Sequence, residues 1–260
     1  MQDYGLVSII TPAWACAAFI GETIKSIQAQ TYTNWELLIQ DDCSTDNTIA
    51  VVSPYMETDS RIKYECNSKN SGAAITRNNA LRRAKGRWIA FLDSDDLWAP
   101  EKLEKQLIFM LENGYHFSYT AYQEIDDRGF RTGVEIHGPK RVDKPGMYSF
   151  CWPGCLTVMY DSETVGLIQI EDIKKNNDYA MWLQVCRKAD CYLLDEVLAS
   201  YRRGRPGSIS TQGIVTLIRW HYKLWKEAEG KGPFTSVFWT SVNLICGVYK
   251  KLFYVKKARL

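Results

Sequence analysis

Two kinds of hydrophobic pattern alternate along the first hundred residues of the chain. Short runs that are apolar almost throughout are typical of strands buried in a parallel sheet. Longer segments between them carry apolar residues at helical spacing, which is typical of helices that pack on such a sheet. The predicted strands are 6–11, 35–40, 62–65 and 87–92, and the predicted helices are 19–30, about 48–56 and 70–85. This order predicts an α/β fold with a doubly wound, mainly parallel sheet and right-handed crossovers.

The last part of the chain has a different pattern. Residues 214–229 and 234–255 have helical character and are separated by Gly-Lys-Gly-Pro at 230–233. Residues 234–249 carry no charge, but their Ser, Thr and Asn side chains and their length make them unsuitable for crossing a membrane. We therefore predict a main domain of residues 1–212, with halves 1–114 and 115–212, followed by a helical appendage at 213–260.

Charge is unevenly distributed between these two parts. The whole chain of 260 residues has a net charge of +2, whereas 214–260 holds nine Lys or Arg against two Glu, or +7. An anionic partner is therefore expected for the appendage, either a membrane surface or a nucleic acid. Aromatic residues interleaved with lysines favour a helix lying in a membrane interface, and no nucleic-acid module is recognisable. Packing of these helices on the protein's own core remains the alternative.

The start of the chain and the cysteines indicate the compartment. A predicted strand begins at Leu6, so no signal-peptide pattern is present. The eight cysteines include no CxxC pair and lie away from histidine partners. Reduced and mostly buried thiols in a cytoplasmic protein are expected.

The densest chemical signal is the acidic run Asp93-Ser94-Asp95-Asp96. It follows the predicted strand 87–92, and Pro100 suits the first turn of the next helix. Open α/β sheets bind ligands at the carboxyl ends of their strands. Closely spaced carboxylates favour an oxygen-preferring cation, Mg²⁺ or Mn²⁺. A helix N-terminus decorated with acids is the alternative interpretation.

Several motifs together resemble one enzyme family. They lie at 7–14, 28–32, 37–46, 77–80 and 92–96, and later at 177–183, 201–202 and 208–210. This set resembles the family 2 glycosyltransferases, which have the GT-A fold. The match is dense from residue 6 to about 105 and loose between 115 and 170. Two departures are visible, since Ala13-Trp14 stands where the family often has Tyr-Asn, and Asn177 replaces the common Glu before Asp178.

The resemblance implies how a nucleotide sugar would bind. Asp42, at the end of the second strand, matches the family position that accepts the N3–H of uracil. Thr11 and Pro12 end the first strand beside the same crevice and are expected to line the base pocket. The chain contains neither GxGxxG nor GxxxxGK[ST], so a dinucleotide fingerprint and a P-loop are excluded.

The diphosphate side is assigned to three further residues. Asp95, with Asp93 close by, is expected to hold Mn²⁺ or Mg²⁺ against both phosphates, where the ion acts as a Lewis acid. Arg77 could offer a bidentate fork to a phosphate. The alternative for Arg77 is an ordinary exposed helix arginine.

Asp178 matches the general base of the family. A carboxylate opposite the leaving diphosphate can take the proton of the acceptor hydroxyl in one inverting displacement. An N-cap for the helix predicted at 179–188 is the other role that Asp178 could fill. His116, His137 and His221 form no recognisable triad with a serine or cysteine.

The resemblance as a whole implies an inverting, metal-dependent hexosyltransferase. It would move galactose or glucose from a UDP-sugar to a saccharide on a polyprenyl diphosphate, at the cytoplasmic face of the bacterial inner membrane. Our specific expectation is β-1,3 transfer onto GlcNAc-diphosphoundecaprenol during O-antigen or other surface-polysaccharide synthesis. A nucleotidyltransferase is one alternative, but it needs a glycine-rich basic loop where this chain has Ala-Trp-Ala-Cys-Ala at 13–17. A non-catalytic sugar-binding or membrane-binding protein is the other, and it is disfavoured by the joint presence of Asp42, Asp95 and Asp178.

Overall fold

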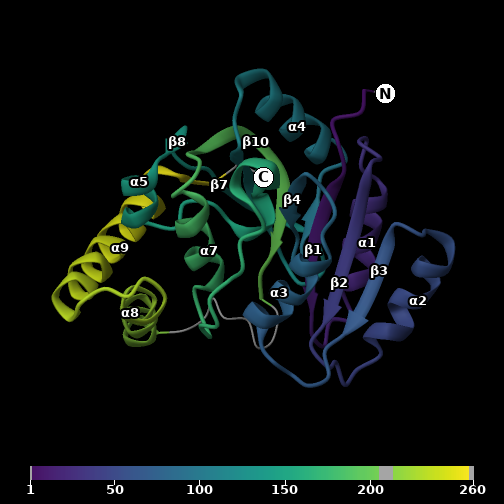
Figure 1. The fold of residues 1–260 in the computed structure, drawn as a ribbon, viewed down its shortest axis with the longest axis horizontal. Coiled ribbons are helices and arrows are strands. Elements are labelled where there is room, and N and C mark those ends of the chain that lie inside the picture. Colours follow the sequence, from purple (N-terminus) through teal and green to yellow (C-terminus); the bar gives the residue numbers. More distant parts are fainter. Residues whose placement is uncertain (1, 205–212, 258–260) are drawn as a thin grey trace.

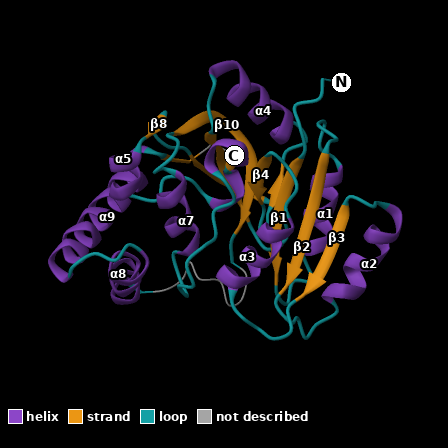
Figure 2. Ribbon diagram, viewed as in Figure 1, coloured by secondary structure: helices purple, strands orange, loops and turns teal. Residues whose placement is uncertain are grey.

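One mixed sheet runs through the computed structural model, which describes residues 2–204 and 213–257 (Figures 1 and 2). The described strands are β1 (Val7–Ala13), β2 (Trp35–Asp41), β3 (Ile62–Cys66), β4 (Trp88–Phe91), β5 (Leu97–Trp98), β6 (Phe117–Ile125), β7 (Arg131–Ile136), β8 (Arg141–Val142), β9 (Met159–Asp161), β10 (Cys191–Arg202) and β11 (Val255–Lys257). The main path of the sheet has the order β11-β7-β6-β9-β4-β1-β2-β3. Off this path, β10 pairs with β6, and β5 and β8 each pair with β10.

The helices surround this sheet. They are α1 (Ile20–Gln28), α2 (Thr48–Thr58), α3 (Ala73–Arg83), α4 (Lys102–Asn113), α5 (Lys144–Ser149), α6 (Ser162–Val165), α7 (Asn177–Val185), α8 (Ile214–Lys223) and α9 (Pro233–Phe253), with a 3-10 turn at Cys155–Thr157 and a π-helical turn at Leu224–Ala228. The predicted match at 208–210 and the basic residue Arg259 lie outside the described residues.

The predicted parallel half of the fold is confirmed. β4, β1, β2 and β3 lie side by side and parallel. A crossover that contains a helix leads from β1 to β2, from β2 to β3 and from β3 to β4. All seven residues of β2 are buried, the polar Glu36, Gln40 and Asp41 as well as the apolar residues at 35 and 37–39. The second half adds antiparallel strands, because β9 pairs with both β4 and β6 and β7 pairs with β6.

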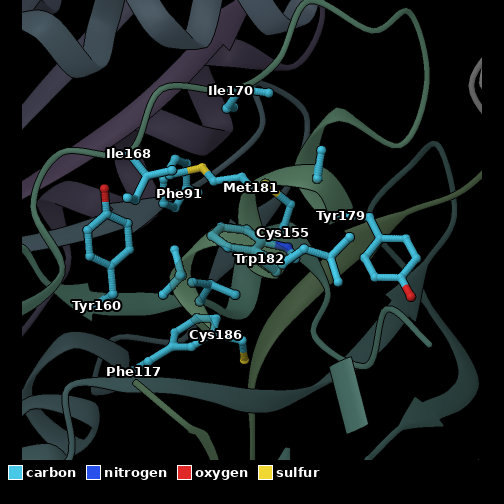
Figure 3. Packing of buried hydrophobic residues seen from close by; sticks show 14 of the residues in the cluster. Phe91, Phe117, Cys155, Tyr160, Ile168, Ile170, Tyr179, Met181, Trp182 and Cys186 are labelled. Carbon is cyan, nitrogen blue, oxygen red and sulfur yellow. The ribbon is translucent and has the colours of Figure 1, made fainter. Parts of the chain in front are cut away.

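Alternate residues of the strands pack into two hydrophobic clusters, one on each face of the sheet. Ile10 faces the cluster that contains α3 and α7, whereas Ile9 faces the cluster that contains α1 and α4. Trp182 of α7 is fully buried in the first cluster, with its ring 5.2 Å from the ring of Phe91 in an edge-on contact (Figure 3). Trp182 therefore belongs to the core.

The C-terminal helices are attached firmly to the rest of the molecule. Trp225 is fully buried, and its indole N–H donates to Asn243 Oδ1 at 2.8 Å. Asn243 in turn donates to the carbonyl oxygens of Tyr148 and Ser149 at 2.9 and 2.8 Å. After α9, β11 pairs with β7 in antiparallel register. The segment thus shares the core and the sheet, while the predicted division near residue 212 remains a prediction.

Candidate active site

The carboxyl ends of β1, β2 and β4 meet at one edge of the sheet because these strands are parallel neighbours. Thr11 and Pro12 lie at the end of β1, and Asp42 directly follows β2, where its N–H donates to the Ala13 carbonyl at 2.8 Å. Thr11 is fully buried, and its Oγ1 has no hydrogen-bond partner within the described residues. The structure therefore brings the predicted base-pocket residues together.

Neighbouring backbone and amide groups fix the orientation of the Asp42 carboxylate. Oδ1 accepts from Asn67 Nδ2 at 2.8 Å and from the Ser71 N–H at 2.7 Å. Oδ2 accepts from the N–H of Gly72 at 2.8 Å. The φ of Gly72 is 84°, a backbone angle that glycine adopts more readily than other residues. A carboxylate offers about four lone-pair sites, so these three bonds leave Oδ2 able to accept one more. Asp42 can still accept a donor group such as a uracil N3–H.

The acids of the run after β4 have different surroundings. Asp96 is buried and its Oδ1 accepts from the backbone N–H of Arg202 at 2.9 Å. Burial, reinforced by the charges of Asp95 and Asp93, raises the pKa of Asp96 well above its usual range. The Asp93 side chain is about a third exposed, at 31%, and Asp95 is partly exposed. Asp96 is therefore part of the protein's internal structure, and Asp93 and Asp95 are the acids accessible to a ligand.

Arg77 connects this acidic run to α7. Its Nη2 donates to Asp93 Oδ1 at 2.6 Å, and its Nη1 donates to Asn177 Oδ1 at 2.7 Å. Burial acts to lower the pKa of Arg77, but the charges of Asp93 and Asp178 outweigh it and raise that pKa, so the guanidinium stays charged. Only 8% of Arg77 is exposed, so the interpretation as an exposed helix arginine is wrong. Phosphate binding by Arg77 stays a prediction, and both terminal nitrogens already have protein partners.

Asp178 lies in the first turn of α7. The predicted capping role is wrong, because the N-cap is Asn176 with a φ of 56°, and Asp178 Oδ1 instead accepts from the adjacent Tyr179 N–H at 2.8 Å. Burial raises the pKa of Asp178, and the Asp93 charge adds to this effect while the Arg77 charge opposes it. A carboxylate with a raised pKa is a better proton acceptor than an ordinary aspartate, which suits a general base.

The acidic donors fit an oxygen-preferring cation. No group of three or more His, Cys, Asp or Glu side chains in residues 2–204 and 213–257 is arranged to hold a metal by itself. Mg²⁺ is commonly coordinated by one or two carboxylates, and substrate phosphates and water complete its coordination shell. The pair Asp93 and Asp95 matches that donor set.

Two partners of the site were not predicted from the sequence. Asn67 follows β3 directly and holds Asp42, and its position after a strand of the parallel half was a usable signal. Asn177 departs from the family motif in the sequence, but its hydrogen bond with Arg77 was not predicted. Nothing local to Asn177 indicates that bond, because it depends on how α3 and α7 pack.

Comparison with known proteins gives the family and the fold. Residues 8–158 match the family described as glycosyl transferase family 2. The chain is 35% identical over 261 residues, covering 100% of both chains, to the UDP-Glc:alpha-D-GlcNAc-diphosphoundecaprenol beta-1,3-glucosyltransferase WfgD of Escherichia coli. The described fold resembles that of S. aureus TarS 1-349 in complex with UDP-GlcNAc, with a TM-score of 0.68, 20% identity, and coverage of 88% of this chain and 69% of TarS 1-349.

A second solved structure has the same fold. The mannosyltransferase PcManGT from Pyrobaculum calidifontis, in complex with GDP-Man and Mn²⁺, matches with a TM-score of 0.66 at 18% identity and covers 92% of this chain and 69% of its own. The expected GT-A architecture, with helices flanking an extensive central sheet, is thereby confirmed, and the sheet is mixed rather than largely parallel. The chain belongs to glycosyl transferase family 2.

Proposed function

We propose that this protein is an inverting hexosyltransferase that moves glucose or galactose from a UDP-sugar to a saccharide on a polyprenyl diphosphate. The observation that carries the proposal is the bridge formed by Arg77, which links Asp93 on the leaving-group side to the helix that bears Asp178. The activity for which the E. coli relative WfgD is named, in an alignment over the whole chain, supports β-1,3 transfer of glucose onto GlcNAc-diphosphoundecaprenol as the specific reaction.

The proposed site residues fall into two groups, one that binds the nucleotide-sugar donor and one that activates the acceptor. Asp42 accepts the uracil N3–H and so positions the nucleotide, and buried Thr11 and half-buried Pro12 shape the pocket next to it. Asp178 takes the proton of the acceptor hydroxyl as that oxygen attacks the anomeric carbon and the diphosphate leaves. A Mn²⁺ or Mg²⁺ ion on Asp93 and Asp95 would supply Lewis-acid stabilisation of the leaving diphosphate. The positive charge of Arg77 lies between the two sides and favours the ionised form of Asp178.

We expect purified protein with Mn²⁺ to release UDP from UDP-glucose or UDP-galactose when GlcNAc-diphosphoundecaprenol is added. The test variant is Asp42→Asn, in which an NH2 group that cannot accept the N3–H replaces one carboxylate oxygen. Its KM for the donor should rise by about 10-fold or more, because a lost hydrogen bond to a buried charged group costs roughly 1.5–3 kcal/mol. Release of pyrophosphate from UTP and a sugar 1-phosphate, without sugar transfer, would instead support a nucleotidyltransferase.

We further propose that α8 and α9 dock on the anionic cytoplasmic surface of the inner membrane. Large apolar side chains are exposed on both helices and form what we call the apolar face. Its members are Ile214, Val215, Leu217 and Ile218 of α8 and Phe234, Val237, Phe238, Ile245, Val248, Tyr249, Leu252 and Phe253 of α9. Exposed apolar patches of this kind mark interaction surfaces.

The polarity of α9 is reversed relative to an ordinary surface helix. Its buried positions are Ser236, Thr240 and Asn243, whereas Phe234 is 91% exposed and Leu252 is 71% exposed. A helix that buries polar residues against its own protein and presents apolar ones outward fits an apolar environment on its outer side. No helix in the described ranges is both long and apolar enough to span a bilayer, so contact along the surface is the geometry that we propose.

Basic residues complete the proposed membrane surface. Exposed Arg219, Lys226, Lys251, Lys256 and Lys257 lie in the same segment as the apolar face. Lys250, expected among them, is instead packed inward, with Nζ donating to the Trp152 carbonyl at 2.8 Å. In Figure 1, α8 lies toward the edge to which the arrowheads of β2 and β3 point. A lipid-linked acceptor would then approach from the side on which the strands end.

We expect the triple variant Ile245→Ser, Val248→Ser and Leu252→Ser to bind vesicles of anionic phospholipid at least about 10-fold more weakly than wild type, since each inserted side chain contributes roughly 1.5–3 kcal/mol when fully buried. Wild-type binding should also weaken with salt, by about 1 kcal/mol per basic residue near the surface. Donor binding should not change, because all three side chains are exposed and lie away from Asp42. Ile49→Ser on α2, another exposed isoleucine, is the control; equal vesicle binding by triple variant and control would contradict the proposal.

A further inference from the structure

Two cysteines from different strand ends share one acceptor beside the donor pocket. Cys43 Sγ donates to the backbone carbonyl oxygen of Asn67 at 2.9 Å, and Cys66 Sγ lies 3.3 Å from the same oxygen. The parallel register that sets Asp41 opposite Cys66 brings them together, since Cys43 follows Asp41 by two residues. Both sulfurs therefore lie within 3.3 Å of one carbonyl oxygen, at the adjacent ends of β2 and β3.

This pair includes the most accessible cysteine of the chain. Cys66 is exposed and Cys43 is partly exposed, as are Cys151 and Cys246, whereas Cys16, Cys155, Cys186 and Cys191 are buried. Burial, together with the nearby Asp41 charge and the Cys43 thiol, raises the pKa of Cys66. No disulfide joins any of the eight cysteines, all of which lie in the described ranges.

The backbone at Cys43 is unusual as well. Its φ is 60°, in the left-handed region that a cysteine adopts only at a cost in free energy. A rearrangement of this turn can release that cost. The turn therefore offers a route by which the Cys43 sulfur could move toward Cys66.

We propose that Cys43 and Cys66 form an oxidisable dithiol that closes to a disulfide when the protein meets a peroxide. In the first step one thiolate attacks hydrogen peroxide, giving a sulfenic acid and, after proton transfer, water. In the second step the other thiol attacks that sulfur, the S–S bond forms, and a second water leaves. The two sulfurs lose two electrons in total, the peroxide gains them, and a dithiol reductant reverses the change by thiol–disulfide exchange.

Closing the disulfide has a direct consequence for Asp42. The sulfurs must come within about 2.05 Å of each other, and a disulfide has no S–H, so neither sulfur can donate to the Asn67 carbonyl any longer. The side chain of Asn67 donates to Asp42 Oδ1 at 2.8 Å and to Thr76 Oγ1 at 3.0 Å. Movement of Asn67 therefore disturbs the carboxylate that the proposed function assigns to uracil, and on that assignment oxidation weakens donor binding.

The experiment treats the full chain with hydrogen peroxide and maps disulfides by mass spectrometry of peptides. We expect a cross-linked peptide containing Cys43 and Cys66, absent from Cys43→Ser and Cys66→Ser and retained in Cys246→Ser, which replaces another partly exposed cysteine. A protein whose other thiols oxidise while Cys43 and Cys66 stay unlinked would overturn the proposal.

Two further measurements test the link to the donor pocket. UDP affinity of the wild type should fall by about 10-fold or more after oxidation and recover with dithiothreitol, while peroxide should leave the affinity of each serine variant where it was before treatment. Amide exchange at Ser71 and Gly72, which donate to Asp42, should speed up on oxidation whether or not UDP binds. Unchanged exchange in the cross-linked protein would overturn the link to Asp42, and failure of the reduced protein to bind UDP would count only against the proposed function.

Discussion

We expect Asp178→Asn to lower turnover by about 10²-fold or more, because the amide keeps the size of the side chain but cannot accept a proton. The bond from the Tyr179 N–H can be kept, since the amide carbonyl replaces the accepting oxygen. UDP-sugar affinity should barely change, because Asp178 serves the acceptor side. The measurement is kcat with saturating donor and acceptor, together with a direct titration of donor binding.

The pH dependence gives a second test of Asp178. The base acts only when ionised, and burial raises its pKa. The rate of the wild type should therefore fall as pH drops through that raised pKa, whereas residual activity of Asp178→Asn should lack this decline. Asp172→Asn, an exposed acid shortly before α7, is the matched control. Near-normal turnover in Asp178→Asn together with a loss of turnover in Asp172→Asn would show that the general base lies in the loop before α7 and not at Asp178.

The second large effect is expected at the acidic run. Asp95→Asn should remove most transferase activity, about 10²-fold or more, because a Lewis acid contributes several kcal/mol to such a transition state. The fold should be retained, since Asp96, and not Asp95, has the buried carboxylate that accepts from the Arg202 N–H. EDTA should have the same effect on the wild type, and Mn²⁺ or Mg²⁺ should restore activity.

The control for that experiment is Glu112→Gln, an exposed acid in the last turn of α4. It should keep both activity and the response to chelator. Thermal unfolding of Asp95→Asn should resemble that of wild type, which separates a lost metal ligand from a lost fold. Full activity of the wild type in chelator would rule out the metal-dependent mechanism.

Much of the parallel half of the fold could be predicted because its signals are local. The apolar residues at 35 and 37–39 indicate β2, and all seven of its residues are buried. Asp42 and Asp93 could be placed at one edge for the same reason, since Asp42 directly follows β2 and only Leu92 separates Asp93 from β4. The antiparallel half was not predicted, because short strands such as β9 have no comparable run of their own.

The interactions between these residues could not be predicted in the same way. Arg77 and Asn177 are 100 positions apart, and their bond exists because α3 and α7 pack on the same face of the sheet. The acids of the run after β4 look equivalent in sequence, and only the arrival of Arg202 at the end of β10 makes Asp96 internal. The sequence did not decide whether the C-terminal helices pack on the core or lie on a membrane. The structure shows that one side of α9 packs on the core while the other side is exposed.

The pairing of β11 with β7 has a consequence for how the chain folds during synthesis. The register joins Val255 to Ile136, so about half of the chain separates the two partners in sequence. Until the last of these residues leaves the ribosome, the side of β7 that β11 later covers has no strand partner on the main path of the sheet. Unpaired strand edges of this kind promote aggregation of folding intermediates. The nascent protein is therefore most vulnerable to self-association between the synthesis of β7 and the synthesis of β11, after the edge that holds Asp42 and Asp93 has emerged.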